Sequence, residues 1–376
     1  MSRVKLGDVA AEVRETSRNT DRLPAVGLEH LTPGDLHLSQ WSETGDNTFT
    51  KLFHEGQILF GRRRAYLKKA AVAPFDGICS GDITVIAANP KKILPRLLPF
   101  IIGDDRFFDY AMEKSAGSLS PRVKWAQLAE YEFDLPEKEK QPQLADLLWA
   151  MERAKKAYQG LLAQTDELVK SQFVEMFGAN KKYPSVHLNE VSLVTSGLTK
   201  NPNRNEFPLK MKYLRVANVL YDHIDLDDIQ EIGVQDEEVN KASLSAGDVL
   251  FVEGNGSPEQ IGRVAVWDGQ VSPMLHQNHI IKARPNHTKV LSRFIMYYFM
   301  TEDGRTQILK NAKTTSGLYT LSLNKIARFT IPLPPIKAQE EFMTLVDQTD
   351  KSKLAIRQTL ESLENSRKAI MKKVFG

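Results

Sequence analysis

Apolar residues recur at three- and four-residue spacing from residue 140 to residue 177, which predicts one long amphipathic helix. The same spacing returns over the last 38 or so residues of the chain. A helix of roughly 38 residues is about 57 Å long, and its single apolar stripe needs a partner, for which its own duplicate is the nearest candidate. The predicted helix-pairing residues are Leu144, Leu148, Tyr158 and Leu162 on the first helix and Phe342, Val346, Ile356 and Leu360 on the second.

The duplication of the helix within one chain favours antiparallel pairing. In that arrangement the segments attached to the two helix starts lie at opposite ends, related by an approximate two-fold axis. A polar residue in the seam, such as Thr165 or Thr349, would help to fix the register. Cysteines introduced near Gln141 and Phe375 should then cross-link.

Outside these helices, the pattern is that of short strands. β-Branched and aromatic runs such as "QILFG" and "DITVIAA" are bounded by Gly, Pro and Asp, and helical stretches follow near residues 96–113. The second half repeats the pattern, with strands expected at "YLRVANV", "DVLFV", "RVAVW" and "NHIIKA" and a helix at "LSRFIMYYFMT". The predicted fold class is α+β, with two mixed α/β globules separated by two long helices in an antiparallel coiled coil.

The two halves are copies of one another. An offset of 198 residues aligns "LPEKEKQPQLADLL…FVEMFG" with "LPPIKAQEEFMTLV…KKVFG" without a gap, and "EGQILFG" matches "AGDVLFV" earlier in each copy. The predicted boundaries are a globule at 1–134, a helix at 135–178, a globule at 179–332 and a helix at 333–376.

Composition limits the classes of function. The chain has 376 residues, 41% hydrophobic and 26% charged, and a net charge of +3. It has no apolar run long enough for a membrane span and no signal peptide, so we expect a cytoplasmic protein without a membrane partner. The single cysteine, Cys79, allows no intrachain disulfide and is expected to be a small buried hydrophobe.

Motifs for catalysis are missing. The dipeptide Gly-Lys of a phosphate-binding loop never occurs, and "GNGSPEQIG" has a proline where a dinucleotide-binding loop would start its helix. His276 and His279 have a spacing that could ligate a metal, but no matching ligand set accompanies them, so structural histidines are favoured. We therefore expect a chain that binds rather than catalyses, with no cofactor and no metal of its own.

Cationic loops are the main candidates for binding. A protein that reads duplex DNA needs cations for phosphates and planar donors or acceptors for base edges. "GRRRAYLKK" offers Arg62, Arg63, Arg64, Lys68 and Lys69, with a solvated charged loop as the alternative interpretation. In the equivalent place, the second copy has "EGNGSPEQIGR", with Asn255 and Arg263.

Two further groups of residues are candidates. The loop before each long helix contains Gly117 or Gly317, which would let backbone amides approach a phosphate closely, although Ser120 and Ser322 could equally cap a short helix there. The DNA-binding candidates in these two loops are Lys114, Ser118, Arg122 and Lys124 in the first copy and Lys313, Thr314, Ser316 and Tyr319 in the second. The third group, in "NPNRNEFPLKMKYLRVAN", comprises Arg204, Lys212, Arg215 and Asn218.

Each copy consists of a globule, an "LP" or "LPP" motif and a long helix that ends in "FG". This order resembles the specificity subunit of type I restriction-modification enzymes. The junctions "GSLSPRVKWAQLAEYEFDLP" and "SGLYTLSLNKIARFTIPLPPIKAQEEF" are similar to those of that family. The family-like positions are mostly architectural: Gly117, Ser118, Gly317, Leu135, Pro136, Leu333, Pro334 and Pro335.

The resemblance implies a DNA-recognition subunit without catalytic activity. Each globule would be a target recognition domain that reads one half of a bipartite site in double-stranded DNA. The helices would measure the spacer and dock two methyltransferase subunits, which carry S-adenosylmethionine, and two restriction subunits, which use ATP and Mg. The alternative from another class is a coiled-coil scaffold with two protein-binding lobes, which would explain the helices but not the cationic loops.

Overall fold

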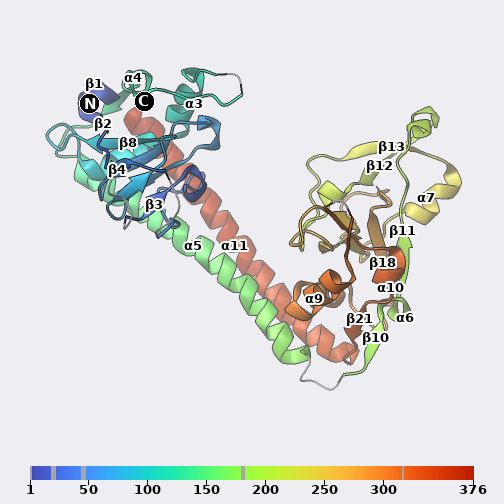
Figure 1. Cartoon of the computed structure of the whole chain (residues 1–376). Coiled ribbons are helices and arrows are strands. Elements are labelled where there is room, and N and C mark those ends of the chain that lie inside the picture. The colour runs from blue at the N-terminus through green and yellow to red at the C-terminus, as the bar shows by residue number, and fades with distance from the viewer. Residues whose placement is uncertain (1, 18–22, 44–47, 118, 179–182, 316) are drawn as a thin grey trace. The chain divides into compact units, whose positions relative to one another are not determined.

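The computed structural model describes residues 2–17, 23–43, 48–117, 119–178, 183–315 and 317–376. The chain divides into two compact units (Figure 1). Unit 1 comprises Met1–Gln159 and Arg357–Gly376, and unit 2 comprises Gly160–Ile356. Each of the two long helices therefore contributes one part to each unit.

Unit 1 is built around a four-stranded antiparallel sheet. Its order is β2-β8-β5-β6, with bounds Ala10–Val13, Ile83–Ala88, Ile58–Gly61 and Ala70–Val72. A smaller sheet, β3-β7-β4, consists of Ala25–Val26, Gly77–Cys79 and Lys51–Phe53, and β1 (Ser2–Lys5) pairs with β9 (Glu132–Leu135). The helices before β9 are α1 (Leu6–Val9), α2 (Leu98–Ile102), α3 (Asp105–Glu113) and α4 (Trp125–Leu128).

Unit 2 repeats this topology. Its main sheet has the order β11-β18-β14-β16, with bounds Ser192–Ser196, Ile280–Pro285, Val249–Val252 and Val264–Val266. The counterpart of β1-β9 is β10-β21, Ser185–His187 with Thr330–Pro332. Two three-stranded sheets follow, β13-β12-β17 (Gln230–Val234, Leu209–Leu214, Leu275–His276) and β15-β20-β19 (Gly254–Asn255, Leu318–Thr320, Lys313–Thr315). The helices are α6 (Leu188–Val191), α7 (Asp236–Ala242), α8 (Ser292–Met300), α9 (Glu302–Asn311) and α10 (Leu323–Ala327).

The identical strand order in the two main sheets confirms the predicted repeat and the mixed α/β character of each half. One predicted strand is too long. "YLRVANV" was expected to be extended throughout, but β12 ends at Leu214 and Val216–Asn218 form a 3-10 turn. The side chain of Asn218 closes this turn, because its Oδ1 accepts a hydrogen bond from the backbone N–H of Arg215 at 2.8 Å.

The long helices are α5 (Gln141–Phe177, 37 residues) and α11 (Ile336–Phe375, 40 residues). In unit 1, Leu148 near the start of α5 shares a core with Phe375 at the end of α11. In unit 2, Phe173 near the end of α5 packs against Phe342 near the start of α11, with ring centroids 5.2 Å apart. Start meets end in both units, so the helix pair is antiparallel, as predicted (Figure 1).

Apolar packing and ion pairs, rather than threonines, fix the register of the two helices. The hydroxyls of Thr165 and Thr349 donate to carbonyls of their own helices, so the suggested register role of these residues is wrong. Lys353, buried on α11, pairs instead with Asp166 of α5. Of the predicted pairing residues, Leu148, Phe342 and Val346 are buried, and Leu144, Tyr158, Leu162, Ile356 and Leu360 are half-buried.

A buried glutamine ties the start of each long helix to its unit. Gln141 accepts a hydrogen bond from the N–H of Leu94 at 2.7 Å and donates to the carbonyl of Pro136 at 2.9 Å. Gln339, at the corresponding position of α11, accepts from Leu291 and donates to Pro334, both at 2.9 Å. Both glutamines are at most 1% exposed, so the "LP" motif and the helix start form one rigid joint in each unit.

Candidate nucleic-acid interface

The same pattern of backbone hydrogen bonds occurs once in each unit. It lies directly after β5 in unit 1 and directly after β14 in unit 2. In unit 1, the N–H of Arg62 donates to the carbonyl of Asp82, and the carbonyl of Arg62 accepts from the N–H of Val123, both at 3.0 Å. In unit 2, Glu253 makes the same two hydrogen bonds, with the carbonyl of His279 at 2.9 Å and the N–H of Leu321 at 2.8 Å. We call each set the junction frame: Arg62, Asp82 and Val123 in unit 1, and Glu253, His279 and Leu321 in unit 2.

Each frame brings three separate segments together. These segments are the residues after β5 or β14, the turn before β8 or β18, and the loop that leads into α4 or α10. The backbone of Arg63 bridges to that of Arg122 in unit 1, and Gly254 pairs with Thr320 in unit 2. The side chains that a frame presents are therefore set by three short segments distant in sequence.

In unit 1 the frame carries a cluster of arginines around one carboxylate. Arg122 donates from Nε to Oδ1 of Asp82 at 2.8 Å and from Nη2 to Oδ2 at 3.4 Å. Arg63 donates from Nη1 to Oδ2 of the same carboxylate at 3.1 Å and from Nε to the hydroxyl of Ser120 at 2.5 Å. Burial alone would raise the pKa of Asp82, but the hydrogen bonds from Arg122 and Arg63 outweigh it, and the pKa lies below its ordinary value.

Beside this cluster lies an open polar hollow of about 660 Å³. It is lined by Thr48, Phe49, Thr50, Lys51, Arg62, Cys79, Ser80, Gly81, Asp82 and Arg122. The Nε of Arg62 is buried and has no hydrogen-bond partner among the described residues.

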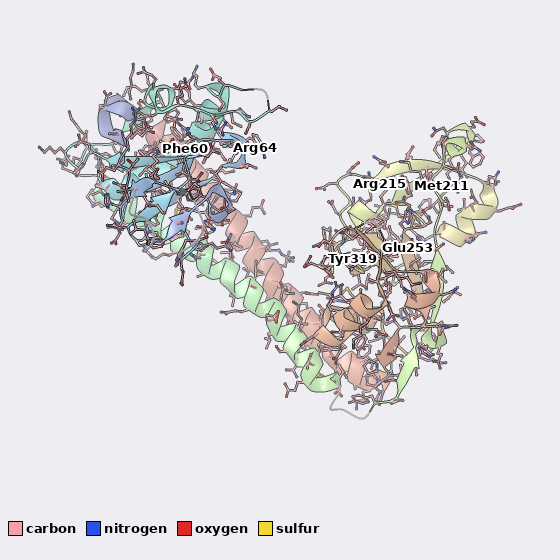
Figure 2. All side chains as sticks on the ribbon, in the orientation of Figure 1. Phe60, Arg64, Met211, Arg215, Glu253 and Tyr319 are labelled. Atoms are coloured by element: carbon pink, nitrogen blue, oxygen red, sulfur yellow. The ribbon has the colours of Figure 1, made fainter. Side chains whose placement is uncertain are left out.

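Arg64, next in the chain after Arg63, is exposed and has a left-handed backbone with φ of 55°. Its position directly after the strand of Phe60 is visible in Figure 2. Such a backbone is uncommon for a residue with a side chain and is often found at functional positions.

Among the described residues, none of the other unit 1 candidates pairs with Asp82. Lys68 pairs with Asp105 at 2.5 Å, and Lys69 donates to the carbonyl of Leu28 at 2.6 Å, so both amines are used within the unit. Lys114 pairs with neighbouring Glu113 at 2.7 Å. Lys124 is exposed, and Ser118 lies outside the described residues.

In unit 2 the frame carries a carboxylate and an imidazole. Nδ1 of His279 lies 2.9 Å from Oε2 of Glu253. Asn255 and Tyr319 follow on paired strands, as the positions of Glu253 and Tyr319 in Figure 2 illustrate. The Oδ1 of Asn255 already accepts a hydrogen bond from the N–H of Ser257 at 3.0 Å. Lys313 is exposed on β19, while Ser316 and the side chain of Thr314 lie outside what the structure describes.

Much of the third predicted group is structural. Arg204 is only 6% exposed and forms a two-pronged pair with Glu238, at 2.8 and 3.0 Å. Asn218 is 2% exposed and holds the turn after β12. Neither side chain therefore has a free edge for DNA, and both stabilise the fold of unit 2.

The other two candidate arginines of unit 2 already make hydrogen bonds within the unit, and the candidate Lys212 is exposed. Arg215 pairs with Asp228 at 2.6 Å, and Arg263 donates to the carbonyl of Val216 at 2.8 Å. Burial lowers the pKa of Arg263 from its ordinary value. Lys212 is exposed on β12. These three residues remain candidates.

Neither of the two serines considered as helix caps caps a helix with its side chain. Ser120 does not cap α4, whose N-cap is Lys124, and its hydroxyl accepts from Arg63 instead. Ser322 is at the N-cap of α10 but makes no capping hydrogen bond with its side chain. The glycines of these loops have left-handed backbones, with φ of 113° at Gly117 and 79° at Gly317, and their approach to a phosphate stays a prediction.

Two buried titratable groups, Cys79 and His276, occupy corresponding places at the ends of β7 and β17. Burial raises the pKa of Cys79 to about 12 and lowers that of His276 to about 4, so both are neutral at neutral pH. Cys79 is fully buried, as predicted for a small hydrophobe. Within the described residues, no group of carboxylate, histidine or cysteine side chains is arranged to hold a metal ion. No helix among them is both long and apolar enough to cross a membrane.

Three residues of the frames were not predicted from the sequence: Asp82, Glu253, and His279 as a partner of Glu253. Asp82 is separated from Arg63 by 19 residues and from Arg122 by 40, so no local pattern shows their contact. The internal repeat held a usable signal, because aligning β8 with β18 places Asp82 opposite His279. Comparing the polar residues at matched positions of the copies would have found them.

Comparisons with known proteins agree with the resemblance. A family model, the type I restriction modification DNA specificity domain, matches residues 180–365. The chain is 30% identical over 200 residues to the type I restriction enzyme EcoKI specificity subunit of Escherichia coli, covering 50% of this chain and 42% of that protein. It is 26% identical over 186 residues to the putative MjaX specificity subunit of Methanocaldococcus jannaschii, covering 49% and 43%. The chain thus spans less than half the length of these curated relatives.

Solved structures share the fold over almost the whole chain. A chain from a study of complex assembly and conformational transition in the type I R-M system covers 99% of this chain and 97% of its own length, with a TM-score of 0.59 and 18% identity. The type I restriction-modification S subunit from M. genitalium covers 100% and 96%, with a TM-score of 0.56 and 12% identity. Residues 180–365 thus match the type I restriction modification DNA specificity domain, and the chain is similar in fold to these solved type I restriction-modification structures.

Proposed function

We propose that this chain recognises a bipartite site in double-stranded DNA, with one half of the site read by each unit. The observation that carries the proposal is the junction frame, which has the same backbone hydrogen bonds in both units but different side chains. A repeated frame with arginines in one copy and a Glu–His pair in the other fits two readers of different base sequences.

Exposed cations in both units support contact with the DNA backbone. Arg64 and Lys124 in unit 1 and Lys212 and Lys313 in unit 2 are exposed, and within the described residues their side chains form no ion pair. Phosphate contacts of this kind position a protein on the duplex, while base contacts supply the specificity. The committed lysines Lys68, Lys69 and Lys114 are weaker candidates for this role.

The helix pair is the proposed spacer and docking surface. Several apolar side chains on the long helices are exposed: Leu147, Leu161, Leu168, Val174 and Leu354. Apolar residues on an otherwise polar helix surface fit a helical partner. We assign that role to two methyltransferase subunits, which bind S-adenosylmethionine, with two restriction subunits supplying ATP- and Mg-dependent cleavage. The chain itself supplies recognition and no catalytic group.

The test is to map methylated adenines in the genome of a host strain with and without this chain. We expect one two-part motif with a fixed spacer to depend on the chain. A methylation map that is the same in both strains would contradict the proposal.

DNA binding by the purified chain separates the proposal from a protein scaffold. We expect affinity for duplex DNA to fall steeply as salt increases, because phosphate contacts release counterions. Binding of protein partners without any salt-sensitive DNA binding would favour the scaffold instead.

A further inference from the structure

We infer that Arg122 reads a guanine in the half-site of unit 1 and that Asp82 positions it for this contact. The inference rests on the proposed function and adds to it the identity of a base and the two residues responsible. It starts from the way in which the guanidinium of Arg122 is held.

An arginine has two edges that can form paired hydrogen bonds. Arg122 directs its Nε and Nη2 toward the carboxylate of Asp82. This leaves the edge formed by Nη1 and the second N–H of Nη2 free, on a side chain that is 45% exposed. Two parallel donors fit the O6 and N7 acceptors of guanine in the major groove, which is the commonest specific arginine contact.

The carboxylate of Asp82 is itself fixed. It is 19% exposed, follows β7 in the turn before β8, and its second oxygen also accepts from Arg63. Arg63 is held in turn by the hydroxyl of Ser120. Arg122 is therefore supported on one edge by a side chain that cannot easily rotate away, which lowers the entropy lost when the free edge binds a base.

The local charge also favours DNA. Asp82 is shared by two arginines, Arg62 lines the hollow beside it, and the exposed Arg64 follows Arg63 in the chain. The hollow next to Arg122 is lined by Gly81, where an added side-chain carbon would meet no atom within 4 Å. The part of the hollow beside Gly81 is thus open.

Unit 2 cannot make this contact at the corresponding place. Thr320 occupies the frame position of Arg122, and His279 that of Asp82. The predicted guanine therefore belongs to only one half of the site, and the other half serves as an internal control.

The experiment is selection of bound sequences from a randomised duplex library by the full chain and its variants. With Arg122→Gln, we expect preference for one guanine, in one half of the motif, to fall about 5- to 150-fold, the range for a bidentate arginine contact. Asp82→Asn should weaken the same guanine preference by a smaller factor, while Asp82→Glu should keep part of it. The matched control is Lys124→Gln, which removes a nearby exposed cation and should lower affinity without changing the motif.

Gly81→Phe provides a variant that keeps every charge and fills the hollow. It should lose the same guanine preference, and circular dichroism should show an unchanged fold. If the unaltered chain selects a two-part motif but Arg122→Gln leaves all guanine preferences intact, the inference is wrong while the proposed function stands. If the unaltered chain selects no motif, both fall together.

Discussion

The two junction frames have one backbone and two chemistries. Arg62 and Glu253 make the same pair of backbone hydrogen bonds, yet one is followed by two arginines and the other by Gly254 and Asn255 of β15. The turn before the next strand supplies Asp82 in unit 1 and His279 in unit 2. The comparison shows how a duplicated fold can diverge in recognition, since the main-chain hydrogen bonds hold the geometry and leave the side chains free to change.

Both units share the pair of long helices. Changing the length of this pair should have the largest effect on the selected DNA motif. We predict that four residues inserted at the same level of both helices, beside Gly160 and beside Arg357, lengthen the pair by about 6 Å. This is close to two base pairs at about 3.4 Å each, so the spacer of the selected motif should grow while both halves stay the same. An unchanged spacer would show that the helices do not measure it.

Arg204 tests the distinction between structural and reading arginines. Arg204→Ala should destabilise unit 2 by about 3 kcal/mol, because it removes the buried partner of Glu238 and leaves the carbonyl of Gly233 without its donor. Urea unfolding followed by the fluorescence of the buried Trp267 would measure this loss. The control, Lys212→Ala, should change stability by less than about 0.5 kcal/mol. A similar small change for both variants would contradict the structural role of Arg204.

Cys79 in unit 1 and His276 in unit 2 are buried at matched positions. They should make the stability of the two units depend differently on pH. The pKa of His276 is about 4 in the fold and 6.5 ordinarily, so the unfolded chain takes up a proton that the folded chain excludes between these values. The contribution of neutral His276 to the free energy of unfolding is complete above about pH 6.5. It is lost as the pH falls toward 4, a decrease of roughly 3 kcal/mol. His276→Cys, which places the unit 1 residue in unit 2, should remove this part of the pH dependence in urea unfolding. If the free energy of unfolding depends on pH in the same way for the variant and the parent, this role of His276 is contradicted.

Glu253 should affect only the half-site of unit 2. A carboxylate accepts hydrogen bonds from the exocyclic amines of cytosine or adenine, and Glu253→Gln changes the acceptor edge while keeping its size. We expect a loss of about 1 kcal/mol in base preference at one position of that half and no change in the other half. Sequence selection would reveal this, and a uniform loss of affinity across all sequences would limit Glu253 to a structural role.

The long-range repeat could be predicted because the apolar period and the "LP…FG" motif are local patterns. Leu148, Phe342 and Val346 follow directly from helical spacing, and the structure buries all three. The roles of the charged residues could not be predicted in this way. Arg204 appeared to be a surface cation because Glu238, its partner, is 34 residues away, and Asp82 was missed because its contacts depend on sheet pairing.

The central claim is that each unit reads its own half of one DNA site. The most direct measurement is sequence selection by the full chain in which Arg62, Arg63 and Arg64 are all replaced by alanine, compared with the unaltered chain. We predict that one half of the motif is weakened or lost while the other half and the spacer remain. Equal loss of both halves, or an unchanged motif with uniformly weaker binding, would contradict it.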